Sequence, residues 1–326
     1  MTNRWEPNLL KISLITPAKK HSKNGNRTSA VRWAGFLREG GHQVRIDMVY
    51  ENEPTDLMIA LHAWRSASSV ARYRARYPKG PLIVALGGTD VNTFLKSDPE
   101  VTENTMDQAH ALVCLHDLIA DVLPERFQDK LHVIKQSALP LSRPRQPSIR
   151  HFDVCVIGHL RDEKDPFRAA LAARQLPETS RLRVIHLGKA HTPTWARQAT
   201  AEMKRNPRYL WKGEVPTWRV RREYARTQLM VISSNQEGGA NVVSEALVAG
   251  VPVIASDIPG NIGLLGRDYP GYYPVRNDTA LADLLHRAET NPIFLQSLLK
   301  HGLQLRENFL PQQEAAGWHR IIELVS

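Results

Sequence analysis

The sequence predicts an α/β protein made of two doubly wound domains that face each other across a cleft. Short runs of Val, Ile and Leu alternate with segments of helical periodicity, a proline-rich stretch interrupts this alternation once, and the alternation then resumes. Strands of continuous apolar residues that alternate with helices are typical of parallel sheets covered on both faces. A chain of 326 residues is long enough for two such domains.

The N-terminal half contains the apolar runs that we expect to form the first parallel sheet. The expected strands lie at residues 11–16, 43–48, 56–62, 81–86, 111–115 and 131–135. Helical patterns separate several of them, for example at residues 28–39 and 66–77. We therefore expect a Rossmann-like domain over residues 1–140.

A linker and a second domain follow. Residues 139–151 read LPLSRPRQPSIRH, and their prolines and weak hydrophobic periodicity indicate a linker, which we place at residues 141–151. Further strands are expected at residues 152–158, 181–188, 208–213, 229–234 and 251–256. We therefore expect a second Rossmann-like domain over residues 152–310 and a C-terminal helix over residues 311–326. The apolar face of this helix, which includes Trp318, would pack back on either domain.

Composition excludes several functional classes. No apolar run approaches the roughly 20 residues of a membrane span, so no membrane partner is expected. The first residues, MTNRWEPNLLKISLITPAKK, lack the apolar core and cleavage site of a signal peptide, which predicts a cytoplasmic protein. Cys114 and Cys155 lie in apolar runs typical of buried, reduced thiols, and the sequence contains no CxxC pair for zinc.

The net charge of +10 is distributed unevenly and favours an anionic ligand. Residues 7–38 contain no acidic residue, and their cations are Lys11, Lys19, Lys20, Lys23, Arg27, Arg32 and Arg38. A loop is expected to carry part of this charge, so we expect anion binding there. A second acid-free stretch, residues 57–89, is expected to be mainly a solvated helix face.

Common motifs for phosphate and metal binding are missing from the sequence. There is no GxxxxGK[ST] loop, no GxGxxG after a strand, no HExxH and no DxD pair. Any bound phosphate must therefore be neutralised by side-chain cations and helix N-termini, and no metal is expected.

Residues 233–256, SSNQEGGANVVSEALVAGVPVIAS, predict a strand, a glycine-containing loop and a short helix. Asn241 is expected to cap the start of the helix, and Gly250 is expected to follow its end. Gly238 and Gly239 would allow the backbone to approach a ligand closely. The first N–H groups of this helix would then face a bound anion.

Charged residues of both signs are expected in the loops that follow the carboxyl ends of the strands in the second sheet. Glu237 lies on the loop before the helix and Glu245 about one turn inside it, so both carboxylates could project into one cleft. An ordinary role stays open, in which Glu245 complements the helix dipole and Glu237 is solvated. Arg161 and Lys164 follow the first strand of the same domain, where two cations suit a diphosphate.

The segments GHLRDEKDP (158–166), WKGEVP (211–216) and 233–256 together resemble the nucleotide-sugar half of GT-B glycosyltransferases of the retaining family 4 type. The resemblance implies that Glu237 contacts donor-sugar hydroxyls, that Glu245 binds the ribose and that Lys164 binds the diphosphate. It further implies donor contacts from the loop around Glu237 and from the base pocket; these residues are Ser234, Gly238, Gly239, Ala240, Asn241, Gly213 and Val215. His159 stands where the family usually has arginine, and Arg161 would take over that diphosphate contact.

The N-terminal half narrows this resemblance. The segments 15–46, 60–74, LGGTD (86–90) and DYPGYYPV (268–275) resemble the selenosugar synthase family of selenoneine biosynthesis over roughly residues 10–290. The resemblance implies transfer of a sugar from a UDP-sugar, with N-acetylglucosamine expected, to selenophosphate. UDP would be released and phosphate would then be lost. Lys164, Glu237, Arg161 and His62 are the catalytic candidates.

Selenophosphate is small and highly charged, which agrees with the basic loop at residues 19–28. Gly25 is expected at its bend, and Asn24, Asn26, Arg27 and Thr28 are expected to bind phosphate oxygens, with Thr28 also capping the next helix. Thr89 is expected to contact sugar or acceptor, and His62 follows a strand in the same half. Asp90 is expected to cap a helix.

Two alternatives stay open. The first is a conventional glycosyltransferase that places the sugar on a hydroxyl group. The second is a nucleic-acid-binding protein that uses RYRARY (72–77) as a basic patch. Since no RNA-binding motif is present, no nucleic-acid partner is expected.

Overall fold

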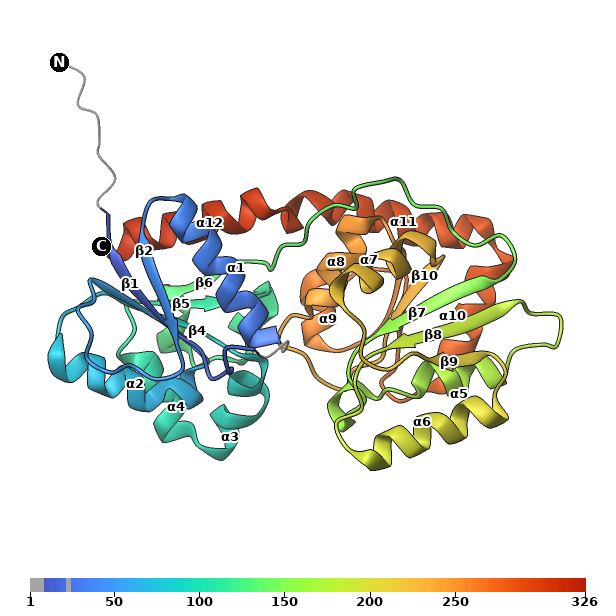
Figure 1. Cartoon of the computed structure of the whole chain (residues 1–326), viewed down its shortest axis with the longest axis horizontal. Coiled ribbons are helices and arrows are strands. Elements are labelled where there is room, and N and C mark those ends of the chain that lie inside the picture. Colours follow the sequence, from blue (N-terminus) through green and yellow to red (C-terminus); the bar gives the residue numbers. More distant parts are fainter. Residues whose placement is uncertain (1–8, 22–24) are drawn as a thin grey trace, which may run out of the picture. The chain divides into compact units, whose positions relative to one another are not determined.

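The computed structural model describes residues 9–21 and 25–326, and each half of the chain forms its own parallel sheet with helices around it (Figure 1). The chain divides into two compact units. The first unit runs to Gln136 and also includes Gln312–Ser326, and the second unit is Ser137–Pro311. The predicted α/β class is therefore confirmed for both halves.

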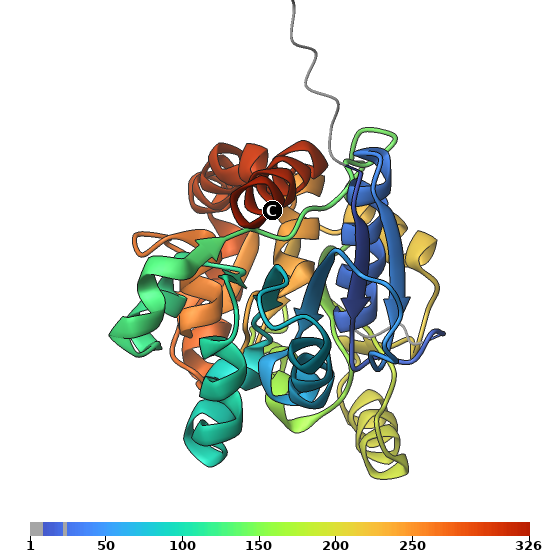
Figure 2. The same cartoon turned by 90° about the vertical axis from the view of Figure 1, so that its left-hand side faces the viewer.

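The first unit contains a six-stranded parallel sheet with strand order β2-β1-β3-β4-β5-β6. Its strands are β1 (Lys11–Ile15), β2 (Gln43–Asp47), β3 (Leu57–Leu61), β4 (Leu82–Ala85), β5 (Ala111–Cys114) and β6 (Leu131–Val133). Its helices are α1 (Gly25–Glu39), α2 (Ala63–Arg76), α3 (Leu95–Ser97), α4 (Pro99–Asp107) and α12 (Pro311–Val325). Figure 2 views this unit from the side, with α1 alongside β1 and β2.

The central strands of this sheet are apolar because both of their faces are covered. Every residue of β3 and β4 is buried, as the continuous Leu, Ile and Val runs predicted. Because all neighbouring strands are parallel, their carboxyl ends reach the same edge of the sheet. The loops that leave these ends can therefore bring distant parts of the sequence together.

Helix α1 begins at Gly25, earlier than the predicted start at residue 28. Asn26, Arg27 and Thr28 therefore lie in its first turn instead of a loop, Gly25 does not form a bend, and Thr28 does not cap the helix. The first N–H groups of a helix lack intrahelical acceptors, so weak helix formers are tolerated at this end. The expected contact from Asn24 lies outside the described residues.

The second unit contains a six-stranded parallel sheet with strand order β12-β11-β10-β7-β8-β9. Its strands are β7 (Phe152–Ile157), β8 (Leu182–Leu187), β9 (Tyr209–Trp211), β10 (Leu229–Ile232), β11 (Val253–Ser256) and β12 (Tyr272–Tyr273). Its helices are α5 (Arg168–Arg174), α6 (Pro193–Arg205), α7 (Thr217–Arg226), α8 (Asn241–Ala249), α9 (Pro259–Leu265), α10 (Asp278–Thr290) and α11 (Pro292–Leu305). The short strand β12 was not predicted, because two residues give no periodicity.

The proline-rich segment before β7 is attached to the second unit. Within this segment, Arg145 donates hydrogen bonds to the main-chain carbonyls of Tyr224, Thr227 and Gly250. A guanidinium group has enough N–H donors to satisfy several carbonyls at once, which fixes an otherwise irregular stretch of chain.

The C-terminal helix α12 packs on α1 through a buried carboxylate. Glu314 is 1% exposed and accepts hydrogen bonds from Arg32 Nε at 2.7 Å and from Trp33 Nε1 at 2.7 Å. The rings of Trp33 and Trp318 lie beside each other, with their centroids 4.6 Å apart. This contact connects the last helix to the first unit, because a buried carboxylate must keep its donors.

We expect Glu314→Ala to lower the free energy of unfolding by about 3 kcal/mol, because Arg32 and the Trp33 indole N–H would lose their buried acceptor. Urea denaturation followed by circular dichroism measures this change. Glu323→Ala, an exposed position on the same helix, is the matched control and should change the stability by less than about 0.5 kcal/mol. Equal unfolding midpoints for both variants would contradict this role of Glu314.

Candidate functional site

The loops after β7 and β10 meet at the carboxyl edge of the second sheet. Ser233, which follows β10, donates from its hydroxyl to the carbonyls of Lys164 and Asp165 at 3.1 and 2.9 Å. Asn235 donates from its side-chain amide to the carbonyl of Asp162 at 2.9 Å. The two loops are thus held together although they are far apart in the sequence.

Lys164 and Glu237, which were predicted from different segments, form a direct ion pair in this place. Lys164 Nζ contacts Glu237 Oε1, and the Ser234 hydroxyl donates to the same carboxylate oxygen at 2.6 Å. The two charged side chains are only 22% and 12% exposed. Such partial burial strengthens the attraction between the ammonium group and the carboxylate, because less water screens the two charges.

Close backbone packing also positions Glu237. A Cβ atom at Gly260, in the first turn of α9, would lie 2.4 Å from the Glu237 carbonyl oxygen and 2.7 Å from its Cβ. Only glycine fits there without a shift of one of the two loops. Ser256 adds a hydrogen bond of 2.6 Å from its hydroxyl to the carbonyl of Ser234.

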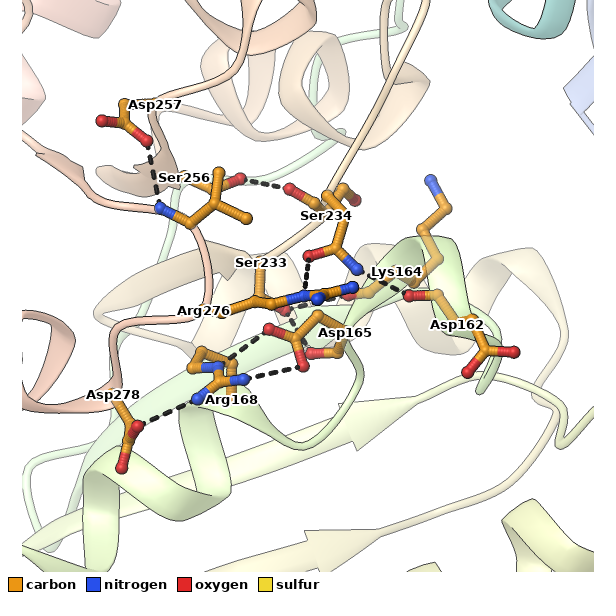
Figure 3. A network of polar contacts seen from close by, with 12 residues as sticks. Asp162, Lys164, Asp165, Arg168, Ser233, Ser234, Ser256, Asp257, Arg276 and Asp278 are labelled. Atoms are coloured by element: carbon orange, nitrogen blue, oxygen red, sulfur yellow. Dashed lines mark hydrogen bonds and ion pairs between the residues drawn. The ribbon is translucent and has the colours of Figure 1, made fainter. Parts of the chain in front are cut away.

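The loop that carries Lys164 is held by a second group of charges. Asp165 has a left-handed backbone with φ of 41°, and its carboxylate accepts from Arg168 Nε at 2.8 Å. Arg168 Nη1 also donates to Asp278 Oδ1 at 2.9 Å (Figure 3). These ion pairs compensate the strain at Asp165 and fix the turn after Lys164.

Helix α8 begins without a side-chain cap. The prediction that Asn241 is the N-cap is wrong: Ala240 occupies the N-cap position, and Asn241 is the first helical residue. The Asn241 Oδ1 atom is buried and has no hydrogen-bond partner among the described residues. Gly239 adopts φ of 120° just before the helix, and Gly250 ends the helix as predicted, in a left-handed conformation. The N-cap residue Ala240 therefore supplies no side-chain acceptor to the first N–H groups of α8.

Glu245 lies inside α8 and is oriented by a tyrosine that the sequence analysis did not identify. The hydroxyl of Tyr224, on α7, donates to Glu245 Oε2 at 3.0 Å. Burial, and then the nearby Glu245 carboxylate, raise the pKa of Tyr224 well above its ordinary value. The hydroxyl therefore stays protonated and acts as a donor to Glu245. In the sequence, Tyr224 has the spacing of a buried position in a helix, and this pattern gave no indication of a functional role.

The remaining donor-side candidates lie in loops of the same unit. Arg161 forms only a long contact of 3.7 Å to Glu163 and is 41% exposed, so it does not join the Lys164–Glu237 pair. Gly158, Lys164, Ser233 and Ser234 line a small pocket at this edge together with His159. Gly213 (φ of 67°), Gly238 and Val215 lie in loops of the same unit, between β9 and α7 or between β10 and α8.

His159, the residue that departs from the resemblance, is held in one tautomer. Its Nδ1 accepts the main-chain N–H of Lys189 at 3.1 Å, which leaves the proton on Nε2. Burial, the neighbouring His191 ring and the charge of Arg161 lower the pKa of His159. A neutral imidazole that offers one N–H donor therefore stands where arginine was expected.

The first unit has its own polar cluster at the carboxyl edge of its sheet. His62 follows β3, and Thr89 and Asp90 follow β4. His62 Nδ1 lies 2.7 Å from Asp90 Oδ1, and His62 Nε2 lies 2.6 Å from the Thr89 hydroxyl. The predicted residues Asn26, Arg27 and Thr28 start α1 after β1, at the same edge of the sheet.

Asp90 is more than the helix cap that we expected. Its carboxylate accepts main-chain N–H groups of Ala63, Trp64 and Gly87 at 2.8, 2.9 and 2.7 Å, in addition to its contact with His62. It is entirely buried, so all of its charge is compensated by these donors. Asp90 therefore fixes the orientation of the imidazole.

Two classes of feature are missing from residues 9–21 and 25–326. No helix there is both long enough and apolar enough to span a bilayer. Within the same residues, no cluster of His, Cys, Asp and Glu side chains has a composition that would hold a metal ion.

Comparison with known proteins shows that this chain is similar to glycosyltransferases. Residues 145–305 match the family "Glycosyl transferases group 1". The chain is 24% identical over 291 residues to Glycosyltransferase 1 domain-containing protein 1 of Xenopus tropicalis, with 80% of this chain and 83% of that protein covered. It is 29% identical over 287 residues to the glycosyltransferase TuaC of Bacillus subtilis strain 168, with 81% of this chain and 69% of TuaC covered.

A solved structure supports the same class at the level of the fold. Anabaena HepE in complex with UDP superimposes with a TM-score of 0.78 at 13% identity, and the match covers 96% of this chain and all (100%) of HepE. Both units are therefore present in that fold. Residues 145–305 thus match the group 1 glycosyltransferases, and the family match, the curated relatives and the fold together support a glycosyltransferase with the GT-B fold.

Proposed function

We propose that the chain is a selenosugar synthase, which transfers N-acetylglucosamine from its UDP-sugar to the selenium of selenophosphate. The contact between Lys164 and Glu237 beside the uncapped start of α8 carries the donor half of this proposal. The acceptor half is supported by the basic segment at residues 7–38 and by the sequence motif SKNGNRTSA (22–30), whose residues 25–30 begin α1.

In this proposal the diphosphate of the donor binds at Lys164 and at the first N–H groups of α8. An anionic diphosphate competes with Glu237 for the Lys164 ammonium group, which frees the carboxylate to accept hydrogen bonds from sugar hydroxyls. Glu245, held by Tyr224, accepts from the ribose hydroxyls. Solved complexes of HepE with UDP and with UDP-glucose support this class of donor.

The acceptor binds in the first unit at the carboxyl edge of the sheet. Asn26, Arg27 and Thr28 contribute main-chain N–H groups and a cation at the N-terminal end of α1, where the helix dipole favours an anion. Gly25 keeps this end of the helix open to a ligand, and Thr89 contributes a hydroxyl from the neighbouring loop. Such a site suits a compact anion better than an extended glycan.

The reaction then requires two bond exchanges. Selenium attacks C1 of the sugar, the bond from C1 to the diphosphate oxygen breaks, and UDP leaves with its electron pair. Lys164, Arg161, the His159 N–H and the start of α8 stabilise the charge that develops on this leaving group. Water subsequently cleaves the phosphorus–selenium bond and releases phosphate.

A second candidate is transfer of the sugar to a hydroxyl acceptor, and the family match and the curated relatives favour this candidate over the selenium acceptor. Mass spectrometry of the products from a panel of UDP-sugars, offered with selenophosphate or with hydroxyl acceptors, separates the two. We expect a selenium-containing sugar and UDP only in the mixtures with selenophosphate. Sugar transfer to a hydroxyl acceptor, with no selenium product, would establish the second candidate instead.

We expect Glu237→Gln to lower kcat/KM for the UDP-sugar about 100-fold, because the neutral amide is a weaker acceptor for sugar hydroxyls and a weaker partner for Lys164. Initial rates of UDP release over a range of donor concentrations measure this. The exposed position Glu178 provides a control, since Glu178→Gln makes the same charge change and should leave the rate unaltered. A rate loss below threefold for Glu237→Gln would exclude its role at the donor.

We expect Arg27→Ala to raise KM for selenophosphate at least 10-fold and to change KM for the UDP-sugar by less than twofold, because it removes a cation from the acceptor side only. Steady-state kinetics with each substrate varied in turn gives both constants. Arg38→Ala, at the exposed last turn of the same helix, is the control. An equal change in both KM values would show that Arg27 does not act at the acceptor.

A further inference from the structure

Asp90, His62 and Thr89 form a continuous hydrogen-bonded chain whose proton positions follow from the contacts. An ionised carboxylate can only accept, so the 2.7 Å contact with Asp90 places a proton on His62 Nδ1. The N–H of Arg65, 3.4 Å from the same nitrogen, then has no lone pair to bind. Nε2 is therefore the basic nitrogen, and the Thr89 hydroxyl donates to it at 2.6 Å.

The backbone at His62 is strained in the conformation that forms these hydrogen bonds. His62 adopts φ of 80° and ψ of 103°, a conformation that residues other than glycine rarely adopt. A Cβ at Gly87 would lie 2.9 Å from the His62 ring, so glycine is needed to make room for the imidazole. Strained non-glycine residues persist where the surrounding structure compensates them and are concentrated at functional sites.

Of these three hydrogen-bonded side chains, Thr89 is the one that reaches the surface. His62 is 2% exposed and Asp90 is 0% exposed, whereas Thr89 is partly exposed and lies beside Gly87 and Gly88. A ligand at the carboxyl edge of this sheet therefore meets the Thr89 hydroxyl and not the imidazole. A hydroxyl bonded to a histidine that is oriented by a carboxylate is the arrangement that activates a nucleophile or transfers a proton.

The two bond exchanges of the proposed reaction differ in their need for a base. Selenophosphate is already ionised when it attacks the sugar, so that step transfers no proton. Water that attacks phosphorus must lose a proton, and general bases in such steps accelerate them by about 10²–10⁴-fold. The structure thus supplies a base, and the second step is the one that requires it.

We propose, on the basis of the selenosugar synthase function above, that Asp90, His62 and Thr89 form a proton relay that removes the phosphate group from the sugar–selenium intermediate. The water oxygen forms a bond to phosphorus, the phosphorus–selenium bond breaks, and its electron pair leaves on selenium as a selenolate. The water proton passes to Thr89 Oγ1 as the hydroxyl proton of Thr89 passes to His62 Nε2. Asp90 positions the imidazole and stabilises the imidazolium that forms.

The test measures UDP and orthophosphate separately, since UDP reports the transfer step and orthophosphate the second step. We expect Thr89→Val to slow orthophosphate release about 100-fold and to slow UDP release much less, because Thr89 is one of several acceptor contacts in the transfer step but supplies the relay hydroxyl in the second step. Mass spectrometry should detect the accumulated selenophospho-sugar. Thr89→Ser keeps the hydroxyl and should restore most of the rate, and Asp90→Asn should slow orthophosphate release while UDP release continues.

Thr93→Val is the matched control. Thr93 lies on the short π-helical segment that follows Thr89 (Asp90–Phe94), it is exposed, and its replacement should alter neither rate. Unchanged orthophosphate release in Thr89→Val would overturn the relay, and so would an equal loss of both products. Wild-type enzyme that releases no UDP with selenophosphate would instead overturn the proposed function itself. The two failures are therefore distinguishable in one assay.

Discussion

The ion pair between Lys164 and Glu237 joins the two loops on which the donor half of the site depends. Its partners come from the ends of neighbouring parallel strands, β7 and β10. Several features hold it in place: the absence of a side chain at Gly260, the Ser234 hydroxyl, and the ion pairs that fix the turn at Asp165. Under the proposed function, these contacts hold the Lys164 cation in place before any substrate binds, as electrostatic stabilisation of an anionic leaving group requires.

The two units apply the same structural rule to different chemistry. In both, parallel strands deliver their polar loops to one edge of a sheet. The second unit places opposite charges and the start of α8 there, which under the proposed function suits a nucleotide sugar. The first unit places a cationic helix start and a hydroxyl–imidazole–carboxylate chain there, which suits a small anion and a proton transfer. Under the proposed function, donor activation and acceptor chemistry are thus divided between the units.

The sequence predicted the features that depend on local patterns. Continuous apolar strands predicted both parallel sheets, because burial on two faces leaves a clear signal, and the left-handed Gly250 was predicted at the end of α8. Features that depend on contacts between distant residues were not predicted. The orientation of Glu245 by Tyr224, the Asp90–His62–Thr89 chain and the direct contact of Lys164 with Glu237 all require the folded backbone. The early start of α1 was missed because three residues of its first turn, Gly25, Asn26 and Thr28, are weak helix formers.

The most direct test of this account is ³¹P NMR of one mixture of the enzyme, UDP-N-acetylglucosamine and selenophosphate, followed over time. Selenophosphate, the donor diphosphate, UDP and orthophosphate give separate resonances in the same spectrum. The account predicts that selenophosphate and the donor disappear together, while UDP and orthophosphate appear in equal amounts and the second follows the first. Persistence of the selenophosphate resonance while the donor is consumed, or while nothing reacts, would contradict it.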